Sequence, residues 1–198
     1  MPITLVVLHS MECPDKPKMA IAVANWFAGP TSPVASAHYC VDDVDIIQCV
    51  KDTDTAWHAP GANSDGIGIE MSGYAAQTQP QWEDAYSLAV IKNAAKLTAE
   101  LCTTYGLPVQ FVDQDGLKVN NSGITTHWEV TKAFKKCDHT DPGPNFPMND
   151  FIGFVNEAVT AAANANTLPS PAPDFVIPMP SPQLNVVVTD DNSGDDQI

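Results

Sequence analysis

The 198-residue sequence predicts an α/β fold, a single domain built on one central β-sheet. Short apolar runs that suit buried strands alternate along the chain with longer segments whose apolar residues recur at helical spacing. Glycine and proline separate these segments, so each is expected to be a separate element. With 44% hydrophobic residues, the chain has enough apolar side chains for the core of one domain of ordinary size.

The first part of the chain is expected to supply three strands and a helix. Residues 3–9 are an apolar run of strand length. Residues 16–27 (KPKMAIAVANWF) follow the helical pattern, which begins after a proline and stops at a Gly-Pro pair. Residues 36–41 and 44–50 are predicted to be paired strands around an acidic turn, DDVD, which we interpret as a solvated turn rather than a calcium site.

The second part of the chain is expected to complete the sheet and its helices. Residues 66–72 (GIGIEMS) are an apolar strand. A long helix is predicted over 83–104, because its apolar residues recur at helical spacing until a glycine and a proline end the pattern. A short strand over 109–112 and an amphipathic helix over 149–163 follow.

A change in composition near residue 167 divides the chain into a domain over 1–166 and a tail over 167–198. The tail contains six of the 17 prolines and five aspartates, but no lysine or arginine. Closely spaced prolines prevent helix and sheet, and the acidic end repels itself. The tail is therefore expected to be an extended, disordered linker, in which only 184–189 (LNVVVT) has strand propensity.

The charge of the chain excludes several classes of partner. Lysine and arginine total 9 against 24 acidic residues, which gives a formal net charge of −15. Such a chain repels nucleic-acid phosphates and anionic lipid headgroups. No apolar run is long enough to span a membrane, and the N-terminus lacks the basic region of a signal peptide. We expect neither a nucleic-acid partner nor membrane insertion. We expect the chain to be made in the cytoplasm without a signal peptide.

The five cysteines do not predict a disulfide framework or a thiol enzyme. Their number is odd and no CxxC pair occurs, so free and mostly buried thiols are expected. Cys13, in MECPDKP, is the candidate nucleophile of a cysteine peptidase. No helix start directly follows it to lower the thiol pKa, so this alternative is disfavoured.

The scarce histidines are candidates for a metal site. His9 ends the first strand, His127 lies in GITTHWEV, and Asp141 lies in the rigid loop TDPGP. Two imidazoles and a carboxylate would leave one position of a tetrahedral zinc open for catalysis. Spacing alone is a weak signal, because neither HExxH nor CxxC occurs. On the residues alone, a hydrogen-bonded core or surface role is favoured over metal binding for each single histidine.

A series of motifs carries a resemblance to a known family. His9 after its strand, SAHY, TAWHAPG, SDGIGIEMSG, GITTH and HTDPGPNFP occur in this order. In this order the chain resembles the zinc-dependent type 2 N-acetylmuramoyl-L-alanine amidases, whose fold is shared by bacteriophage endolysins and peptidoglycan recognition proteins. The resemblance runs from about residue 3 to 159 and implies a single central mixed β-sheet flanked by helices. AWHAPG and HTDPGPNFP are most similar to actinobacteriophage lysins.

The resemblance implies a zinc site and a catalytic pair. His9, His127 after the GIT turn, and Asp141 match the zinc ligands. Glu70 in GIGIE matches the glutamate that takes a proton from the attacking water and passes it to the departing amine. His139 stands where several relatives carry a lysine that stabilises the oxyanion, and imidazole is only partly protonated near neutral pH. Nearby Lys135 and Lys136 are the alternative cations.

Three residues of the TAWHAPG and GANSDG segments are the candidate substrate-binding residues: Trp57, His58 and Asn63. For Trp57 a core role, and for Asn63 a turn role, remain as alternatives. Trp26, Trp82 and Trp128 are interpreted as packing residues.

The resemblance implies zinc-dependent cleavage of the bond between N-acetylmuramic acid and L-alanine in peptidoglycan by a monomer. A phage endolysin would stay in the host cytoplasm until a holin releases it. A cytoplasmic recycling amidase and a peptidoglycan-binding module without activity remain as alternatives. Loss of a zinc ligand would mark the binding module, and all three candidate ligands are present here.

Overall fold

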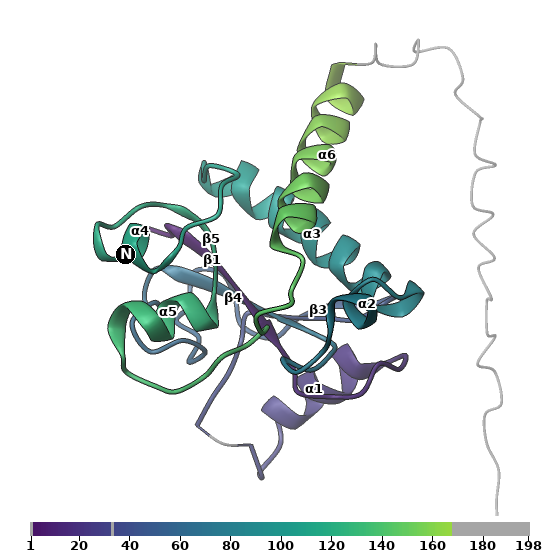
Figure 1. Ribbon diagram of the computed structural model, residues 1–198, viewed down its shortest axis with the longest axis vertical. Helices are drawn as coiled ribbons and strands as arrows, with labels where there is room; N and C mark the ends of the chain where they lie inside the picture. Colours follow the sequence, from purple (N-terminus) through teal and green to yellow (C-terminus); the bar gives the residue numbers. More distant parts are fainter. Residues whose placement is uncertain (1, 33, 168–198) are drawn as a thin grey trace, which may run out of the picture. The chain divides into compact units, whose positions relative to one another are not determined.

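A mixed β-sheet lies at the centre of residues 2–32 and 34–167, the part of the chain that the computed structural model describes (Figure 1). Its five strands have the order β3-β2-β4-β1-β5. The strands β2, β4, β1 and β5 run parallel to one another, and β3, at one edge, is antiparallel to β2. The strands are β1 (Leu5–Ser10), β2 (Tyr39–Val41), β3 (Ile46–Gln48), β4 (Gly66–Met71) and β5 (Gly123–Thr126).

Helices cover both faces of the sheet, which confirms the predicted fold class. One face packs against α3 and α6, which lie side by side in Figure 1, and the other packs against α4 and α5. The short α2 precedes α3, and α1 lies against β2 and β3. The helices are α1 (Met19–Phe27), α2 (Gln79–Trp82), α3 (Ala85–Tyr105), α4 (Gln114–Lys118), α5 (His127–Phe134) and α6 (Met148–Thr167).

The alternation of side chains along β4 determines what each face of the sheet can hold. Ile67, Ile69 and Met71 are buried in the cluster formed with α3 and α6. The alternate positions point to the opposite face, where the first two are glycines and the third is Glu70. A Cβ atom at Gly68 would lie 2.6 Å from Cγ of His58. The glycine therefore allows the segment that carries His58 to lie directly on the sheet.

The predicted strand over 109–112 is wrong. Only one residue of it, Phe111, forms an isolated bridge to Ile124 of β5. Pro108 precedes this segment, and Asp113 already caps α4, since its side chain accepts hydrogen bonds from the backbone of the first helical turn. The segment therefore lies between a proline and the first turn of a helix, and a longer ladder with β5 does not form.

Two further predictions need correction. The GIT segment is not a turn but part of β5, and α5 begins directly after it. The acidic turn between β2 and β3 is not simply solvated, because Asp42 is buried. Its carboxylate accepts hydrogen bonds from the backbone N–H of Ala20, Val44 and Asp45 at 2.9, 2.9 and 2.7 Å, and so joins α1 to the turn.

Residue 84 provides a direct test of how α3 begins. Asp84 is the N-cap, and its Oδ1 accepts a hydrogen bond from the Ser87 N–H at 2.8 Å. We expect Asp84→Ala to lower the free energy of unfolding by about 1 kcal/mol in urea denaturation, because this N–H loses its partner. Asp84→Asn keeps an acceptor oxygen and should retain most of the stability. Equal losses in both variants would contradict the capping role.

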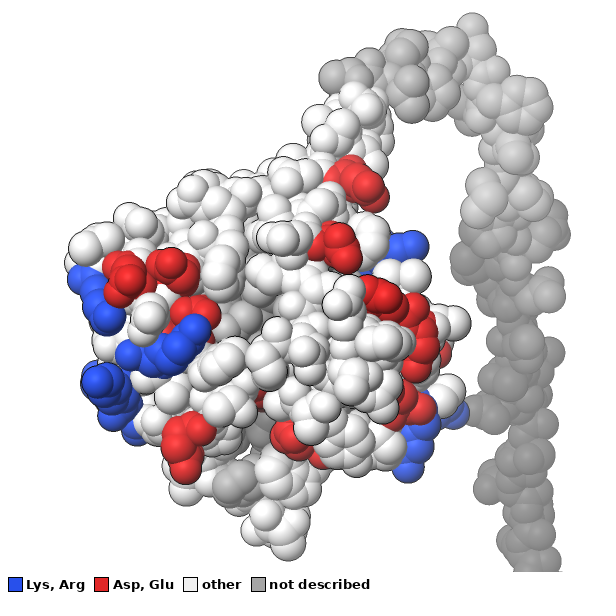
Figure 2. Space-filling model, viewed as in Figure 1, with Lys and Arg blue, Asp and Glu red and all other residues white. Residues whose placement is uncertain are grey.

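Lysine side chains gather over α4 and α5 on the face drawn in Figure 2, although the chain as a whole is acidic. Two of these lysines have acidic partners: Lys118 pairs with Asp115 at 2.9 Å, and Lys132 pairs with Glu129. In the described residues, no helix combines the length and the apolar character needed to cross a membrane. The predicted tail, including 184–189, lies outside the described residues from position 168 onward.

Candidate metal centre and active site

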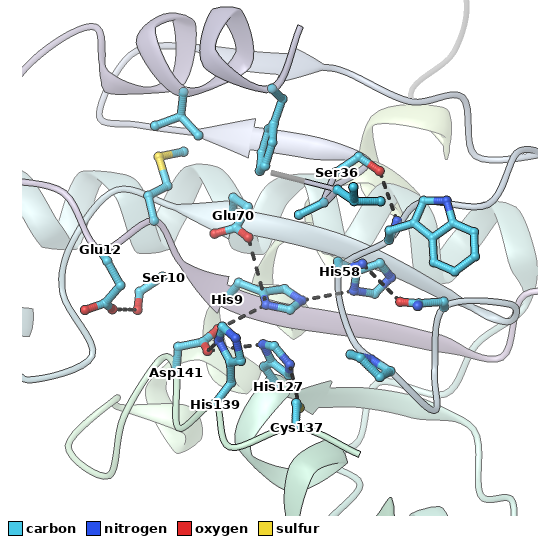
Figure 3. A pocket seen from close by; sticks show the side chains of 18 of the residues that line it. His9, Ser10, Glu12, Ser36, His58, Glu70, His127, Cys137, His139 and Asp141 are labelled. Atoms are coloured by element: carbon cyan, nitrogen blue, oxygen red, sulfur yellow. Dashed lines mark hydrogen bonds and ion pairs between the residues drawn. The ribbon is translucent and has the colours of Figure 1, made fainter. Parts of the chain in front are cut away.

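Three residues from distant parts of the chain meet at the carboxyl ends of the central strands. His9 is near the end of β1, His127 is the first residue of α5 directly after β5, and Asp141 lies in the segment between α5 and α6. Since β1 and β5 are parallel neighbours, with Leu8 paired to Thr126, their ends bring the two histidines together. Figure 3 shows the carboxylate of Asp141 beside both rings.

The geometry of this cluster suits a metal ion. Nδ1 of His9 lies 3.0 Å from Oδ2 of Asp141, and Nδ1 of His127 lies 3.1 Å from Oδ1. Each of the three residues is buried and offers one ligand atom, and these atoms lie within 4.8 Å of one another. Two imidazole nitrogens and one carboxylate oxygen form a donor set that zinc accepts, with a further position left for substrate or water. The residues therefore fit zinc.

The electrostatics of the cluster favour the protonation states that bind metals. Burial lowers the pKa of His9 and, more strongly, that of His58, so both imidazoles are held neutral. Burial would raise the pKa of Asp141, but its contacts with the ring nitrogens of His127 and His9, at 3.1 and 3.0 Å, outweigh burial and hold the pKa below its ordinary range. A neutral imidazole and an ionised carboxylate are the forms that coordinate a cation.

Glu70 lies beside the cluster because of the register of the central strands. It is paired with His9 in the parallel ladder between β4 and β1, and its Oε1 lies 4.0 Å from Nδ1 of His9. Its side chain is 15% exposed and lines a pocket of about 470 Å³. Burial, with added repulsion from Asp141 and Glu12, raises the pKa of Glu70 well above its usual range. The carboxylate is thus poised to accept a proton in the pocket.

Of the three candidate cations, His139 is the one that reaches this pocket. Its ring stacks on that of His127 with centroids 4.5 Å apart, and its Nδ1 lies 3.4 Å from Oδ1 of Asp141. The side chain is 61% exposed and lines the pocket. Lys135 and Lys136 are exposed, and neither is among the residues that line the pocket.

The candidate substrate-binding residues are in three different environments. Trp57 is 61% exposed on the wall of the pocket, where a substrate could contact it. Asn63 also lines the pocket, but its Oδ1 accepts hydrogen bonds from the backbone N–H of His58 and Ala59 at 3.0 and 2.7 Å. His58 is only 8% exposed, and both of its ring nitrogens contact protein atoms. Neither nitrogen is therefore available to a substrate.

The pocket is also lined by residues that the sequence did not identify as site residues. Trp26, which was interpreted as a packing residue, is 45% exposed and forms part of the wall with Val23 and Phe27 of α1. Cys137 lines the pocket too, and its Sγ lies 3.4 Å from Nε2 of His127 and 3.0 Å from Oγ1 of Thr131. A tryptophan on the apolar α1 and a cysteine within a loop are not distinctive in the sequence. In contrast, Trp82 is fully buried, as predicted.

The structure also weighs against a cysteine peptidase. All five cysteines are free, as predicted. Cys13 is buried, and its Sγ contacts Oγ of Ser72 at 3.5 Å rather than a histidine. Burial raises the pKa of the Cys13 thiol, which disfavours the reactive thiolate.

Comparison with known proteins gives consistent matches. The chain is 27% identical over 164 residues to N-acetylmuramoyl-L-alanine amidase A of Achromobacter lyticus, covering 76% of this chain and 82% of that protein. It is 30% identical over 181 residues to a probable N-acetylmuramoyl-L-alanine amidase of Bacillus licheniformis, covering 82% of this chain. The match spans 46% of the length of the Bacillus protein, so that relative is about twice as long as the matched region.

The fold is similar to those of solved structures. The hydrolase AmiA of Staphylococcus aureus, solved with its ligand, superimposes with a TM-score of 0.64 at 21% identity, over 82% of this chain and 76% of AmiA. AmpD superimposes with a TM-score of 0.53 at 25% identity, over 78% of this chain and 86% of AmpD. A mutant endolysin from Bacillus subtilis has a TM-score of 0.52 at 19% identity, over 78% of this chain and 85% of the endolysin.

The family assignment follows from a match to a whole protein family. Residues 1–144 match the family described as N-acetylmuramoyl-L-alanine amidase, Amidase_2, and this range includes the candidate metal cluster, Glu70 and the pocket. The matched range is most of the 198 residues. The chain belongs to the N-acetylmuramoyl-L-alanine amidase family.

Proposed function

We propose that the chain hydrolyses, with zinc as its cofactor, the amide bond between N-acetylmuramic acid and L-alanine in bacterial peptidoglycan. The observation that carries this proposal is the buried cluster of His9, His127 and Asp141 at the base of a pocket that also holds Glu70. Membership of the amidase family supports the reaction and the substrate class.

The pocket residues have complementary roles in this reaction. His9, His127 and Asp141 would hold the zinc ion, which when bound supplies Lewis acidity that polarises the scissile carbonyl and lowers the pKa of water. Glu70 takes the proton from the attacking water, whose oxygen forms the new bond to the carbonyl carbon. Glu70 then delivers that proton to the nitrogen of L-alanine as the carbon–nitrogen bond breaks, so the products are a carboxylic acid and a free amine.

The remaining site residues contact the substrate in this proposal. His139, an exposed residue that contacts Asp141, donates the hydrogen bond that stabilises the developing oxyanion. Trp57 offers an exposed aromatic face to the glycan or the stem peptide. Asn63 keeps its amide NH₂ group for a further hydrogen bond, since the contacts that hold its loop use Oδ1.

We further propose that the biological setting is host lysis by a phage endolysin, with the chain acting as a monomer on the wall after release from the host cytoplasm. The similarity of the motifs AWHAPG and HTDPGPNFP to those of phage lysins supports this setting. A recycling amidase would act on soluble wall fragments rather than on intact wall. A binding module without activity would bind the wall but cut nothing.

A single experiment separates these possibilities. Purified actinobacterial peptidoglycan and soluble muropeptides are each incubated with the chain, with and without a zinc chelator, and the products are identified by mass spectrometry. We expect free stem peptides that begin with L-alanine, released from intact wall and lost on chelation. Release from soluble fragments alone would favour recycling. Sedimentation with the wall but no cleavage would favour a binding module.

A further inference from the structure

His58 lies directly behind the candidate metal ligand His9, on the side away from Asp141 (Figure 3). Nδ1 of His58 is 3.0 Å from Nε2 of His9, and the two rings meet edge to face with centroids 5.2 Å apart. On its other side, Nε2 of His58 lies 3.1 Å from the carbonyl oxygen of Gly66. His58 therefore connects the backbone of β4 to the outer nitrogen of His9.

The donors and acceptors in this series of contacts determine which nitrogen carries each hydrogen. The carbonyl oxygen of Gly66 can only accept, so Nε2 of His58 must carry a hydrogen. A neutral His58 then has its lone pair on Nδ1, and this lone pair faces His9. The hydrogen between the two rings consequently belongs to Nε2 of His9. A neutral His9 then has its lone pair on Nδ1, and a cation between this nitrogen and the Asp141 carboxylate, 3.0 Å away, would bind both.

We propose that His58 is a positioning residue, which fixes His9 in the tautomer whose Nδ1 lone pair is directed at the metal. This inference rests on the proposed zinc cofactor. Without His58, Asp141 would favour the opposite tautomer, since its Oδ2 lies 3.0 Å from Nδ1 of His9 and would accept a hydrogen from it. Metal binding would then first require the hydrogen to leave Nδ1.

The surroundings of His58 are arranged to hold it in this position. Its ring lies against Gly68, where a Cβ atom would come within 2.7 Å of Nδ1. Its backbone N–H donates to Oδ1 of Asn63 at 3.0 Å, which fixes the loop. Gly66 supplies the acceptor carbonyl. The TAWHAPG and GIGIE segments thus meet through His58, and the glycines in GIGIE provide both the space and the acceptor.

The second histidine ligand has a different outer partner. Nε2 of His127 faces Sγ of Cys137 at 3.4 Å, a weakly polar contact without a further connection to a strand. Of the two candidate histidine ligands, His9 is therefore the one whose tautomer depends on a partner anchored to a strand, and this partner is His58.

The first test reads the tautomer in the metal-free wild-type protein. Long-range ¹H–¹⁵N correlation of the imidazole nitrogens distinguishes a hydrogen on Nε2 from one on Nδ1. We expect Nε2 of His9 to carry a hydrogen in the wild type, and Nδ1 alone to carry one in His58→Phe, which keeps an aromatic ring but removes both nitrogens. A wild-type His9 with a hydrogen on Nδ1 alone would overturn the proposal, and this measurement needs no variant to fold.

The second test measures zinc affinity by competition with a chromophoric chelator. His58→Phe should bind zinc about 10- to 100-fold more weakly, the loss typical of a missing outer partner of a histidine ligand. His58→Asn should recover part of the loss, because its amide oxygen can accept the hydrogen of His9. His58→Phe with wild-type zinc affinity would contradict the positioning role.

His38 provides the matched control for His58, and zinc binding by the wild type separately tests the cofactor. His38 is also buried and its ring lies 5.6 Å from that of His58, but its nitrogens contact the carbonyl oxygen of Asp54 and the backbone N–H of Gly68 rather than a candidate ligand. His38→Gln should leave the tautomer of His9 unchanged. If the wild type bound no zinc, the cofactor proposal would fail, while the tautomer measurement would still decide whether His58 sets the tautomer of His9.

Discussion

Asp141→Ala is expected to abolish both zinc binding and amide hydrolysis. Asp141 contacts both imidazoles of the cluster and is its one negative ligand, so its loss leaves two neutral nitrogens to hold a divalent cation. We expect the zinc affinity to fall by more than about 100-fold, beyond the range for outer partners of a ligand. Chelator competition, with metal analysis of the purified variant, measures this effect directly.

Asp138→Ala is the matched control for this change. Asp138 is an exposed carboxylate of the same segment, and it is not part of the candidate metal cluster. Its removal changes the net charge by the same amount and should leave zinc content and turnover close to those of the wild type. An Asp141→Ala variant that carried no metal and kept full activity would refute the metal mechanism.

Glu70→Gln is expected to separate metal binding from turnover. Glutamine has nearly the same shape as glutamate but cannot take a proton from water, so turnover should fall by roughly 100-fold or more. Zinc should still bind, because Glu70 is not among the three residues of the cluster. Turnover on a soluble muropeptide, measured at full zinc loading, gives the size of the loss.

Glu12→Gln controls for the loss of a negative charge in the pocket. Glu12 lines the same pocket, but its carboxylate is held by Oγ of Ser10 and the backbone N–H of Ala75 at 2.8 and 2.7 Å. A much smaller loss of turnover is expected for this variant. Equal losses in the two variants would mean that the pocket charge, rather than a base at Glu70, determines the rate.

The three residues of the candidate metal cluster and Glu70, which the structure brings together, could be picked out from the sequence because each lies in a recognisable local motif. The arrangement that brings them together could not be predicted in this way. β1 lies between β4 and β5, and this order places His9 beside both Glu70 and His127. Strand order depends on contacts between segments far apart in the chain, and the pattern of one segment does not contain that information.

The errors in the sequence prediction have local physical causes. β5 ends at Thr126 and α5 begins at His127, so no glycine or proline marks the change from strand to helix. In the same way, Trp57 and His58 are neighbours in one motif, yet Trp57 is exposed and His58 is buried. A loop has no fixed periodicity, so its sequence does not tell which side chain points to the pocket and which to the sheet.

The segment between α5 and α6, residues 135–147, contains no helix or strand, yet it supplies Asp141 to the cluster. His9, by contrast, belongs to a strand that is paired on both sides. An ion bound by both residues would act as a cross-link between this loop and the centre of the sheet. Part of its binding energy would then appear as protection of residues 135–147 from proteolysis and exchange. A bound catalytic ion would therefore also tie residues 135–147 to the central sheet.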